Sequence, residues 1–299
     1  MTLLRQVRMR LVSYDDGSGI DRIGYVHEDR IVDLGEVIGG YGQPGPLSAM
    51  RRLLERWDEV RDTLPAPDAA AGPALDSVTL LSPVPDPTKI VAAPVNYQDH
   101  RSEMELTVDI GDLAVFLKAP SSLIAHGGVV QLPYSDRRVD QEGELAVVIG
   151  RRARDVSPQD ALSYVAGYTG CLDITMRGGE DRSTRKSFDT FTPLGPWLVT
   201  PDEADPADDT ELTCTVGGAE RQKTNTRHLI WGVAELIAYI STVMTLEPGD
   251  VIATGTPSGV GPITDGDAIE VTLSGIGTLA VTVATKPGAG PSPTGTRER

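Results

Sequence analysis

The most constraining stretch of the sequence is 140–145, DQEGEL, which places two carboxylates at the head of an apolar run. Glu142 and Glu144 are two positions apart, and the run from Leu145 to Ile149 is typical of a buried β-strand. Because side chains i and i+2 of a strand share a face, the two carboxylates are expected side by side. Neighbouring carboxylates repel unless a positive charge lies between them, and a divalent cation commonly supplies it. A solvated strand edge with two unrelated acids is the alternative.

Length and composition set the broad class of protein. A chain of 299 residues exceeds a typical single domain, so we expect one large domain with a small appendage. The net charge of −16 opposes binding to nucleic acid and to anionic membrane surfaces. Cys171 and Cys214 form neither a zinc-ligand spacing nor a disulfide framework, and no apolar stretch is long enough to span a membrane. We therefore expect a cytoplasmic protein with no nucleic-acid or membrane partner.

The first part of the chain is expected to be a small β-rich module. Short β-prone runs alternate with Asp and Gly turns over residues 9–34. The segment PAPDAAAGPALD, at 65–76, has the composition of a linker. We therefore expect three parts, namely an N-terminal β-rich module with one helix and a linker (1–75), a catalytic domain (76–285) and a disordered tail (286–299).

Two segments have the apolar periodicity of an α-helix. Residues 48–64 place apolar side chains at helical spacing with charged residues opposite, which predicts the helix of the N-terminal module. Residues 226–244 form the clearest predicted helix, with Thr226 as its N-cap. Both apolar faces are expected to pack in the core.

A candidate catalytic base follows a short apolar strand at 90–93. From Tyr97 onward the spacing predicts a short helix, on which His100 and Glu103 face each other at i and i+3. Histidine ionises near neutral pH, and a neighbouring carboxylate can fix its orientation. The alternative is a simple ion pair on an exposed helical turn.

Lysine is scarce in this chain, which makes each lysine a stronger candidate for a specific role. The lysines are Lys89, Lys118, Lys186, Lys223 and Lys286. Lys118 points out of an otherwise apolar run, FLK, where a site role and an exposed strand position are both open. Lys186 begins a crowded polar stretch, KSFDTFTP, that suits the rim of a substrate site.

Two further segments contribute polar groups. Asp173 ends the strand YVAGYTGCLD and could complete a set of three carboxylates with Glu142 and Glu144, although such an Asp is also common in turns. The Gly-rich segment 246–261 lacks the lysine of a P-loop and the spacing of a dinucleotide fingerprint, so no nucleotide cofactor is expected. Its amides and hydroxyls, including that of Thr256, could bind a carboxylate.

Seven segments together resemble the fumarylacetoacetate hydrolase family, in the order NYQDHRSEM, FLKAPSS, DQEGELAVVIG, GYTGCLD, KSFDTFTPLGPW, VAELIAYIS and LEPGDVIATGTPSGVG. The resemblance covers about residues 80–283 and is strongest to the branch of acylpyruvases and 2-hydroxyhepta-2,4-diene-1,7-dioate isomerases. It implies an α+β fold, a mixed β-roll around a metal site with a small N-terminal β-rich module, often assembled as a homodimer.

The resemblance also implies roles for individual residues. The expected metal ligands are the three carboxylates Glu142, Glu144 and Asp173. The expected ion is Mg²⁺ or Mn²⁺, and Ca²⁺ is a further ion that crystals could hold. The expected catalytic residues are His100 and Glu103, on a lid over about residues 97–105, and Lys186. The expected substrate-binding residues are Tyr97, Lys118, Arg177 and Thr256.

Some positions depart from the family pattern. Pro94 stands where the family usually has glycine, and Val95 stands where Arg or Leu is common. The segment TMRG at 175–178 replaces the usual SARD and keeps only Arg177. These differences fall on the substrate side of the site, so they concern the substrate rather than the metal.

The site suits chemistry on an oxygen-rich 2-oxo or diketo acid, whose enolate a divalent cation stabilises. We expect hydrolytic cleavage of a C–C bond in a β-diketone acid, such as an acylpyruvate or a fumarylacetoacetate-like compound. Isomerase, decarboxylase, hydratase or cyclase activity through the same site is an alternative. A family member that binds metal and ligand without turnover is the second alternative.

Overall fold

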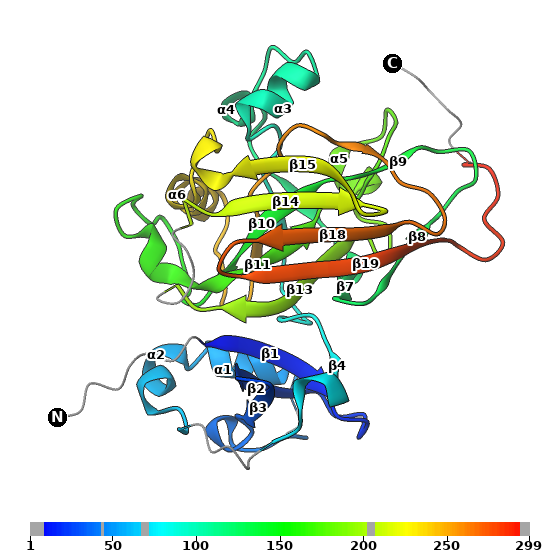
Figure 1. The fold of residues 1–299 in the computed structure, drawn as a ribbon. Coiled ribbons are helices and arrows are strands. Elements are labelled where there is room, and N and C mark those ends of the chain that lie inside the picture. Colours follow the sequence, from blue (N-terminus) through cyan, green and yellow to red (C-terminus); the bar gives the residue numbers. More distant parts are fainter. Residues whose placement is uncertain (1–8, 43–44, 67–71, 202–206, 294–299) are drawn as a thin grey trace.

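The computed structural model describes residues 9–42, 45–66, 72–201 and 207–293, which form three β-sheets with short helices around them (Figure 1). The largest sheet contains, in spatial order, β3 (Arg30–Asp33), β2 (Arg22–His27), β1 (Arg10–Asp15), β13 (Thr192–Val199), β11 (Val165–Leu172), β10 (Gly143–Ile149), β16 (Val251–Ala253), β5 (Ile90–Ala92) and β6 (Phe116–Lys118). At its side, β4 (Thr79–Leu80) pairs with β1, and β7 (Leu123–Ala125) pairs with β13.

Two smaller sheets complete the fold. One contains β15 (Ala219–Asn225), β14 (Glu211–Val216), β18 (Ala268–Leu273), β19 (Gly277–Thr285) and β8 (Val129–Leu132). The other contains β12 (Thr175–Met176), β9 (Val139–Gln141) and β17 (Gly261–Pro262). The α-helices are α1 (Ala49–Leu54), α2 (Trp57–Val60), α3 (Gln98–Glu103), α4 (Ile110–Leu113), α5 (Arg182–Arg185) and α6 (Val233–Val243). Mixed sheets with few helices confirm the predicted α+β class.

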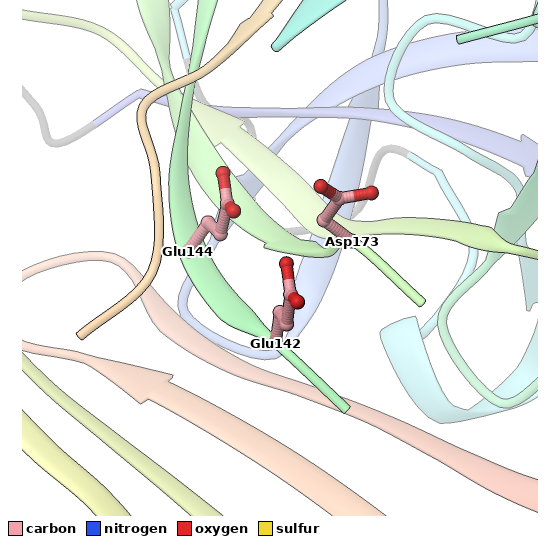
Figure 2. Close-up of side chains that lie close together, drawn as sticks. All are labelled: Glu142, Glu144 and Asp173. Carbon is pink, nitrogen blue, oxygen red and sulfur yellow. The ribbon is translucent and has the colours of Figure 1, made fainter. Parts of the chain in front are cut away.

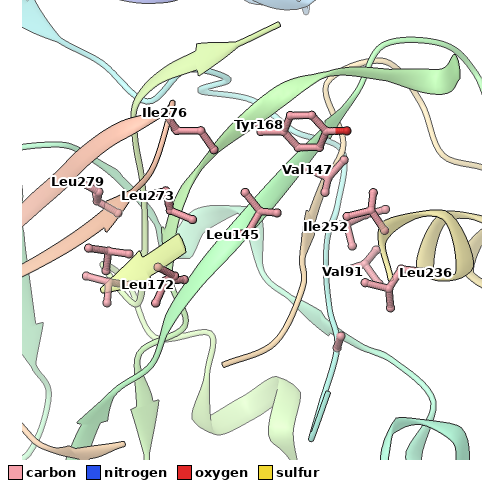
Figure 3. Packing of buried hydrophobic residues seen from close by; sticks show 14 of the residues in the cluster. Val91, Leu145, Val147, Tyr168, Leu172, Leu236, Ile252, Leu273, Ile276 and Leu279 are labelled. Carbon is pink, nitrogen blue, oxygen red and sulfur yellow. The ribbon is translucent and has the colours of Figure 1, made fainter. Parts of the chain in front are cut away.

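The central strands β10 and β11 are buried along their whole length. Leu145 of β10 and Leu172 of β11 belong to one apolar cluster with Leu273 and Leu279 of the second sheet (Figure 3). Burial of each such side chain contributes roughly 1.5–3 kcal/mol. Both faces of β10 and β11 are covered. The residues at the ends of these two strands are therefore held on a rigid support.

The N-terminal module extends the main sheet. Strand β1 pairs antiparallel with β13, with Arg10 opposite Val199 and Leu11 opposite Leu198. Side chains of the module and of β10 and β11 share a second apolar cluster, which includes Leu11 and Val148. The division near residue 75 stays a prediction, and residues 67–71 of the expected linker lie outside the described residues.

Part of the expected tail belongs to the described structure. The backbone N–H of Ser135 donates to the carbonyl of Gly290 at 3.0 Å, and the N–H of Ser292 donates to Asp136 Oδ1 at 2.7 Å. Residues 294–299 lie outside the described residues.

The helix expected over 48–64 is interrupted. Ser48 caps α1 by accepting a hydrogen bond from the Arg51 N–H at 3.2 Å, but the chain leaves helical geometry at Arg56, where φ is −113°. A second short helix, α2, and a 3₁₀ turn follow, and Trp57 stays buried. The Arg56 N–H donates to the carbonyl of Leu53, three residues earlier, as in a 3₁₀ turn. This tighter last turn of α1 changes the direction of the chain before α2.

The helix expected over 226–244 starts later than predicted. Thr226 lies in a 3₁₀ turn capped by Asn225, and α6 begins at Val233. The intervening backbone is held instead by Asn96, whose carbonyl accepts from Ile230 at 2.8 Å and whose side chain bonds Trp231. These tertiary hydrogen bonds outweigh the helical periodicity. In the described part of the chain, no helix is both long and apolar enough to cross a membrane.

His126, between β7 and β8, gives a testable pH dependence. Its Nδ1 accepts a hydrogen bond from the Ala280 N–H at 3.1 Å, and burial lowers the pKa of the ring. The unfolded chain therefore takes up a proton before the folded chain, so stability falls as the pH drops below about 6.5. His126→Gln should lose less stability than the wild type between pH 7.5 and pH 5, measured by urea unfolding. Parallel losses would contradict this.

Candidate metal centre

The pairing of β10 with β11 brings the three expected carboxylates together. Gly143 lies opposite Leu172, the last residue of β11, so Asp173 follows that strand directly beside Glu142 and Glu144. The Asp173 N–H donates to the Glu142 carbonyl at 2.8 Å, which fixes the junction. One oxygen of each side chain lies within 4.8 Å of the others, and all three side chains are buried (Figure 2).

Two buried ammonium groups contact this cluster. Lys118, at the end of β6, contacts Asp173 and donates to the Phe191 carbonyl at 2.9 Å. Lys186, directly after α5, donates to Glu142 Oε2 at 2.7 Å and also contacts Asp173. Lys118 is 1% exposed, so the interpretation as an exposed strand lysine is wrong.

The charges of the cluster are unevenly balanced. Burial raises the pKa of Glu144, and the negative charge of Asp173 raises it further, whereas the Gly255 N–H donates to Glu144 at 2.8 Å. Burial also raises the pKa of Asp173, but the ammonium groups of Lys118 and Lys186 outweigh it and hold that pKa below its usual range. Glu144 is therefore the carboxylate that lacks a close cation.

The donor set fits a hard divalent cation. Oxygen ligands that share one Mg²⁺, Mn²⁺ or Ca²⁺ ion lie at about 2.0–2.6 Å from it, and so within about 4–5 Å of one another. Three carboxylates and no soft ligand favour these ions over zinc or copper. Three protein ligands also leave coordination positions for a substrate and water. Glu142, Glu144 and Asp173 could thus hold one divalent ion, which would supply the positive charge that Glu144 lacks.

The expected base and its orienting carboxylate lie on α3, as predicted. His100 Nδ1 lies 3.2 Å from Glu103 Oε2, and His100 lines the same cavity as the three carboxylates. His100 is 7% exposed, so it does not form the exposed ion pair considered from the sequence. In Figure 1, α3 lies on the opposite side of the main sheets from the N-terminal module.

Hydrogen bonds tie α3 to the Gly-rich loop after β16. Ser258 Oγ donates to Asp99 at 2.9 Å, and the Gly259 N–H donates to Glu103 Oε1 at 2.9 Å. The loop approaches closely because Gly255, at φ +102°, has no side chain: a Cβ there would lie 2.7 Å from that of Asn96. These bonds fasten α3, which lies within the expected lid, at the cavity that the three carboxylates line.

The predicted substrate-binding residues differ in their surroundings. Arg177 and Thr256 line the cavity, and Lys118 lies behind Asp173. The Thr256 hydroxyl is already engaged, because it donates to the Gly143 carbonyl at 3.0 Å and accepts from Gln222 at 2.7 Å.

Tyr97, also predicted to bind substrate, is fully buried. Its hydroxyl has no hydrogen-bond partner among the described residues. Burial raises the pKa of this phenol, and the charge of Glu144 raises it further, so the group stays a neutral donor.

Several residues of the site escaped the sequence analysis. Asp140 is fully buried and accepts hydrogen bonds from Arg138 and from Arg177, the latter at 2.6 Å. Arg177 also donates to Glu142 at 3.3 Å, so Asp140 acts through Arg177 to position Glu142, one of the three candidate ligands. Gln222 holds the N–H of Gly143 at 2.8 Å. Asp140 stands inside the DQEGEL stretch and could have been considered, whereas Gln222 carries no sequence signal.

Comparisons with known proteins agree with this geometry. A family model described as "Fumarylacetoacetate (FAA) hydrolase C-terminal" matches residues 89–284. The chain is 42% identical to a maleylpyruvate hydrolase of Aquipseudomonas alcaligenes, over 88% of this chain and 96% of that protein. It is 38% identical to a 2,4-didehydro-3-deoxy-L-rhamnonate hydrolase of a Sphingomonas species, over 80% and 91% of the two chains.

Solved structures are similar over nearly the whole chain. A maleylpyruvate hydrolase from Sphingobium sp. SYK-6, in complex with manganese(II) and pyruvate, matches with a TM-score of 0.81 and 38% identity, over 93% of this chain and 99% of that one. A 2-hydroxyhepta-2,4-diene-1,7-dioate isomerase from Mycobacterium marinum matches with a TM-score of 0.72 and 32% identity, over the same shares. The chain belongs to the fumarylacetoacetate hydrolase family and is an enzyme of that family.

Proposed function

We propose that this enzyme is a divalent-metal-dependent hydrolase that cleaves a C–C bond in a β-diketone acid of the acylpyruvate type. The observation that carries the proposal is the placement of the His100–Glu103 pair in the same cavity as the three carboxylates. Hydrolysis needs a base to activate water, and the pair supplies one beside the cation site. The similarity to maleylpyruvate hydrolases supports the same reaction.

The metal is proposed to be Mg²⁺ or Mn²⁺, held by Glu142, Glu144 and Asp173. The manganese in the similar Sphingobium structure supports this choice. When bound, such an ion polarises the oxygens of a 2-oxo acid and stabilises negative charge that develops on them. Arg177 and Asp140 keep Glu142 in position for this role.

The side chains around the metal site have separate roles in the proposed reaction. With Nδ1–H donating to Glu103, His100 presents Nε2 as the base that takes a proton from water. The water oxygen attacks the carbonyl carbon of the acyl group, the C–C bond breaks, and its electron pair passes to the pyruvate enolate, which then takes up a proton. Lys186, which lines the cavity, stabilises oxyanion charge with its ammonium group, whereas Lys118 holds Asp173 from behind.

Substrate access requires the lid to move. The cavity beneath α3 measures about 80 Å³, well below the roughly 300 Å³ of a small-molecule pocket. Opening would break the bonds from Ser258 to Asp99 and from Gly259 to Glu103. Val95, just before the lid, has φ +50°, a conformation that costs a β-branched residue about 1–3 kcal/mol.

Isomerisation is the second candidate function. The similar isomerase from Mycobacterium marinum supports it, because both reactions pass through an enolate at one metal site. An isomerase releases no pyruvate, so the products separate the two functions. The family resemblance further supports a cytoplasmic homodimer as the working form.

Replacement of His100 tests the hydrolase proposal. His100→Ala should lower kcat/KM for pyruvate release from an acylpyruvate by about 100-fold or more, because the general base is lost. The increase in Tm on addition of Mn²⁺ should persist, because His100 is not among the three carboxylates. His27→Ala, in β2 of the N-terminal module, is the matched control and should leave turnover unchanged. Wild-type turnover in His100→Ala would sink the assignment of the base.

Replacement of Glu144 tests the metal site. Glu144→Gln should be at least as stable as the wild type without metal, because a buried carboxylate without a close cation is removed. Addition of Mn²⁺ should hardly change the free energy of unfolding of this variant. The same addition should raise the free energy of unfolding of the wild type by about 2.7 kcal/mol when the Mn²⁺ concentration is a hundred times Kd. Glu220→Gln, on the exposed β15 hairpin, should respond like the wild type. An equal Mn²⁺ response in Glu144→Gln would place the ion elsewhere.

A further inference from the structure

Gln141 is a fully buried polar side chain at the end of β9, directly before Glu142. Its side-chain N–H donates to the Gly259 carbonyl at 3.0 Å, and its side-chain oxygen accepts from the Gly261 N–H at 3.1 Å. The first partner can only accept and the second can only donate, so the orientation of the amide is determined. Both ends of this buried amide are therefore bonded, and the Gly-rich loop is tied to β9.

The same residue of the loop also holds the proposed base. The Gly259 N–H donates to Glu103 Oε1 at 2.9 Å. The other oxygen of that carboxylate, Glu103 Oε2, lies 3.2 Å from His100 Nδ1. A continuous path of hydrogen bonds therefore runs from Gln141 through Gly259 and Glu103 to His100.

The loop lies close against strand β15 at this point. Gly259 has φ +96°, and a Cβ there would lie 1.9 Å from the Arg221 carbonyl oxygen. The side chain of Gln222 donates to the Pro257 carbonyl at 2.9 Å, which holds the loop two residues earlier. The contact with β15 and the bond from Gln141 together fix the position of the Gly259 N–H.

We propose that Gln141 is a positioning residue for the general base, which it places through Gly259 and Glu103. Because Glu142 follows Gln141 directly, one short segment then sets the position of both a candidate metal ligand and the base that acts beside it. Misplacement of a reacting group by about 1 Å can lower a rate by about 100-fold. The inference rests on the proposed function for the role of His100.

Replacement of Gln141 by methionine tests the inference. Gln141→Met keeps the length of the side chain but loses both bonds to the loop. The kcat for pyruvate release from an acylpyruvate should fall by about tenfold or more, because the base is misplaced. The Kd of the metal-free variant for Mn²⁺, measured by calorimetry, should stay within about twofold of the wild-type value, since all three carboxylates are kept. That measurement also shows that the site is folded.

Two results of this comparison would overturn the inference. One is a wild-type kcat in Gln141→Met. The other is a loss of Mn²⁺ affinity as large as the loss of kcat, because Gln141 would then act on the carboxylates rather than on the base. Should Gln141→Met not fold, Gln141→Asn keeps a buried amide on a shorter side chain and should show the same loss of kcat without loss of Mn²⁺ affinity.

A double-mutant cycle tests whether Gln141 acts through His100. In the His100→Ala background, Gln141→Met should lower the residual kcat by less than about twofold, because the base that it positions is absent. A loss as large as in the wild-type background would contradict the proposed path. Gln131→Met is the matched control, since Gln131 is exposed on β8, and it should keep the wild-type kcat.

Hydrogen exchange separates this inference from the proposed function, because it needs no turnover. The backbone amides of α3 should exchange about tenfold faster or more in Gln141→Met than in the wild type, whereas those of β10 should keep their rate. If no acylpyruvate is hydrolysed but α3 exchanges faster, the proposed hydrolysis fails and the placement of α3 by Gln141 stands. If acylpyruvates are hydrolysed and Gln141→Met changes neither kcat nor exchange, the placement fails and the hydrolase stands.

Discussion

The structure depends on the burial of three like charges at one point. Glu142, Glu144 and Asp173 meet where β10 begins and β11 ends, and none is more than 5% exposed. Each buried carboxylate costs several kcal/mol unless a cation or hydrogen-bond donors compensate it. Lys118, Lys186 and Arg177 supply part of that compensation. The charge that remains on Glu144 is the physical reason to assign a divalent ion to this site.

The two kinds of support around this cluster differ in stiffness. Strands β10 and β11 are covered on both faces and hold the carboxylates in a fixed arrangement. The base, His100, instead lies on the short helix α3, which two hydrogen bonds fasten to the Gly-rich loop. The carboxylates are thus held rigidly, whereas α3, which carries His100, is fastened by bonds that can break. This arrangement suits a reaction that must admit a substrate and then exclude bulk water.

The central features of the site could be predicted from local patterns. Strand alternation placed Glu142 beside Glu144, and helical spacing placed His100 beside Glu103. Asp173 could only be a candidate from its position at a strand end, because the pairing that brings it to Glu142 joins residues distant in sequence. Lys118 likewise gave no local sign of its burial.

Other features depend on contacts that no local pattern records. The segment after Thr226 is held out of α6 by bonds to Asn96, which lies about 130 residues earlier in the chain. Arg182 and Arg185 stand at the two ends of α5, in a polar stretch that gives no sign of burial, and only the fold shows that both line the cavity. The sequence therefore predicted the three carboxylates and the His100–Glu103 pair more completely than the other residues that line the same cavity.

The central claim is that the three carboxylates share one divalent cation. Its most direct test is anomalous diffraction at the manganese absorption edge from crystals grown with Mn²⁺. The account predicts one anomalous peak at about 2.0–2.6 Å from an oxygen of each of Glu142, Glu144 and Asp173. The absence of a peak there in crystals of catalytically active enzyme, with the Lys186 ammonium still bonded to Glu142 and Asp173, would contradict it.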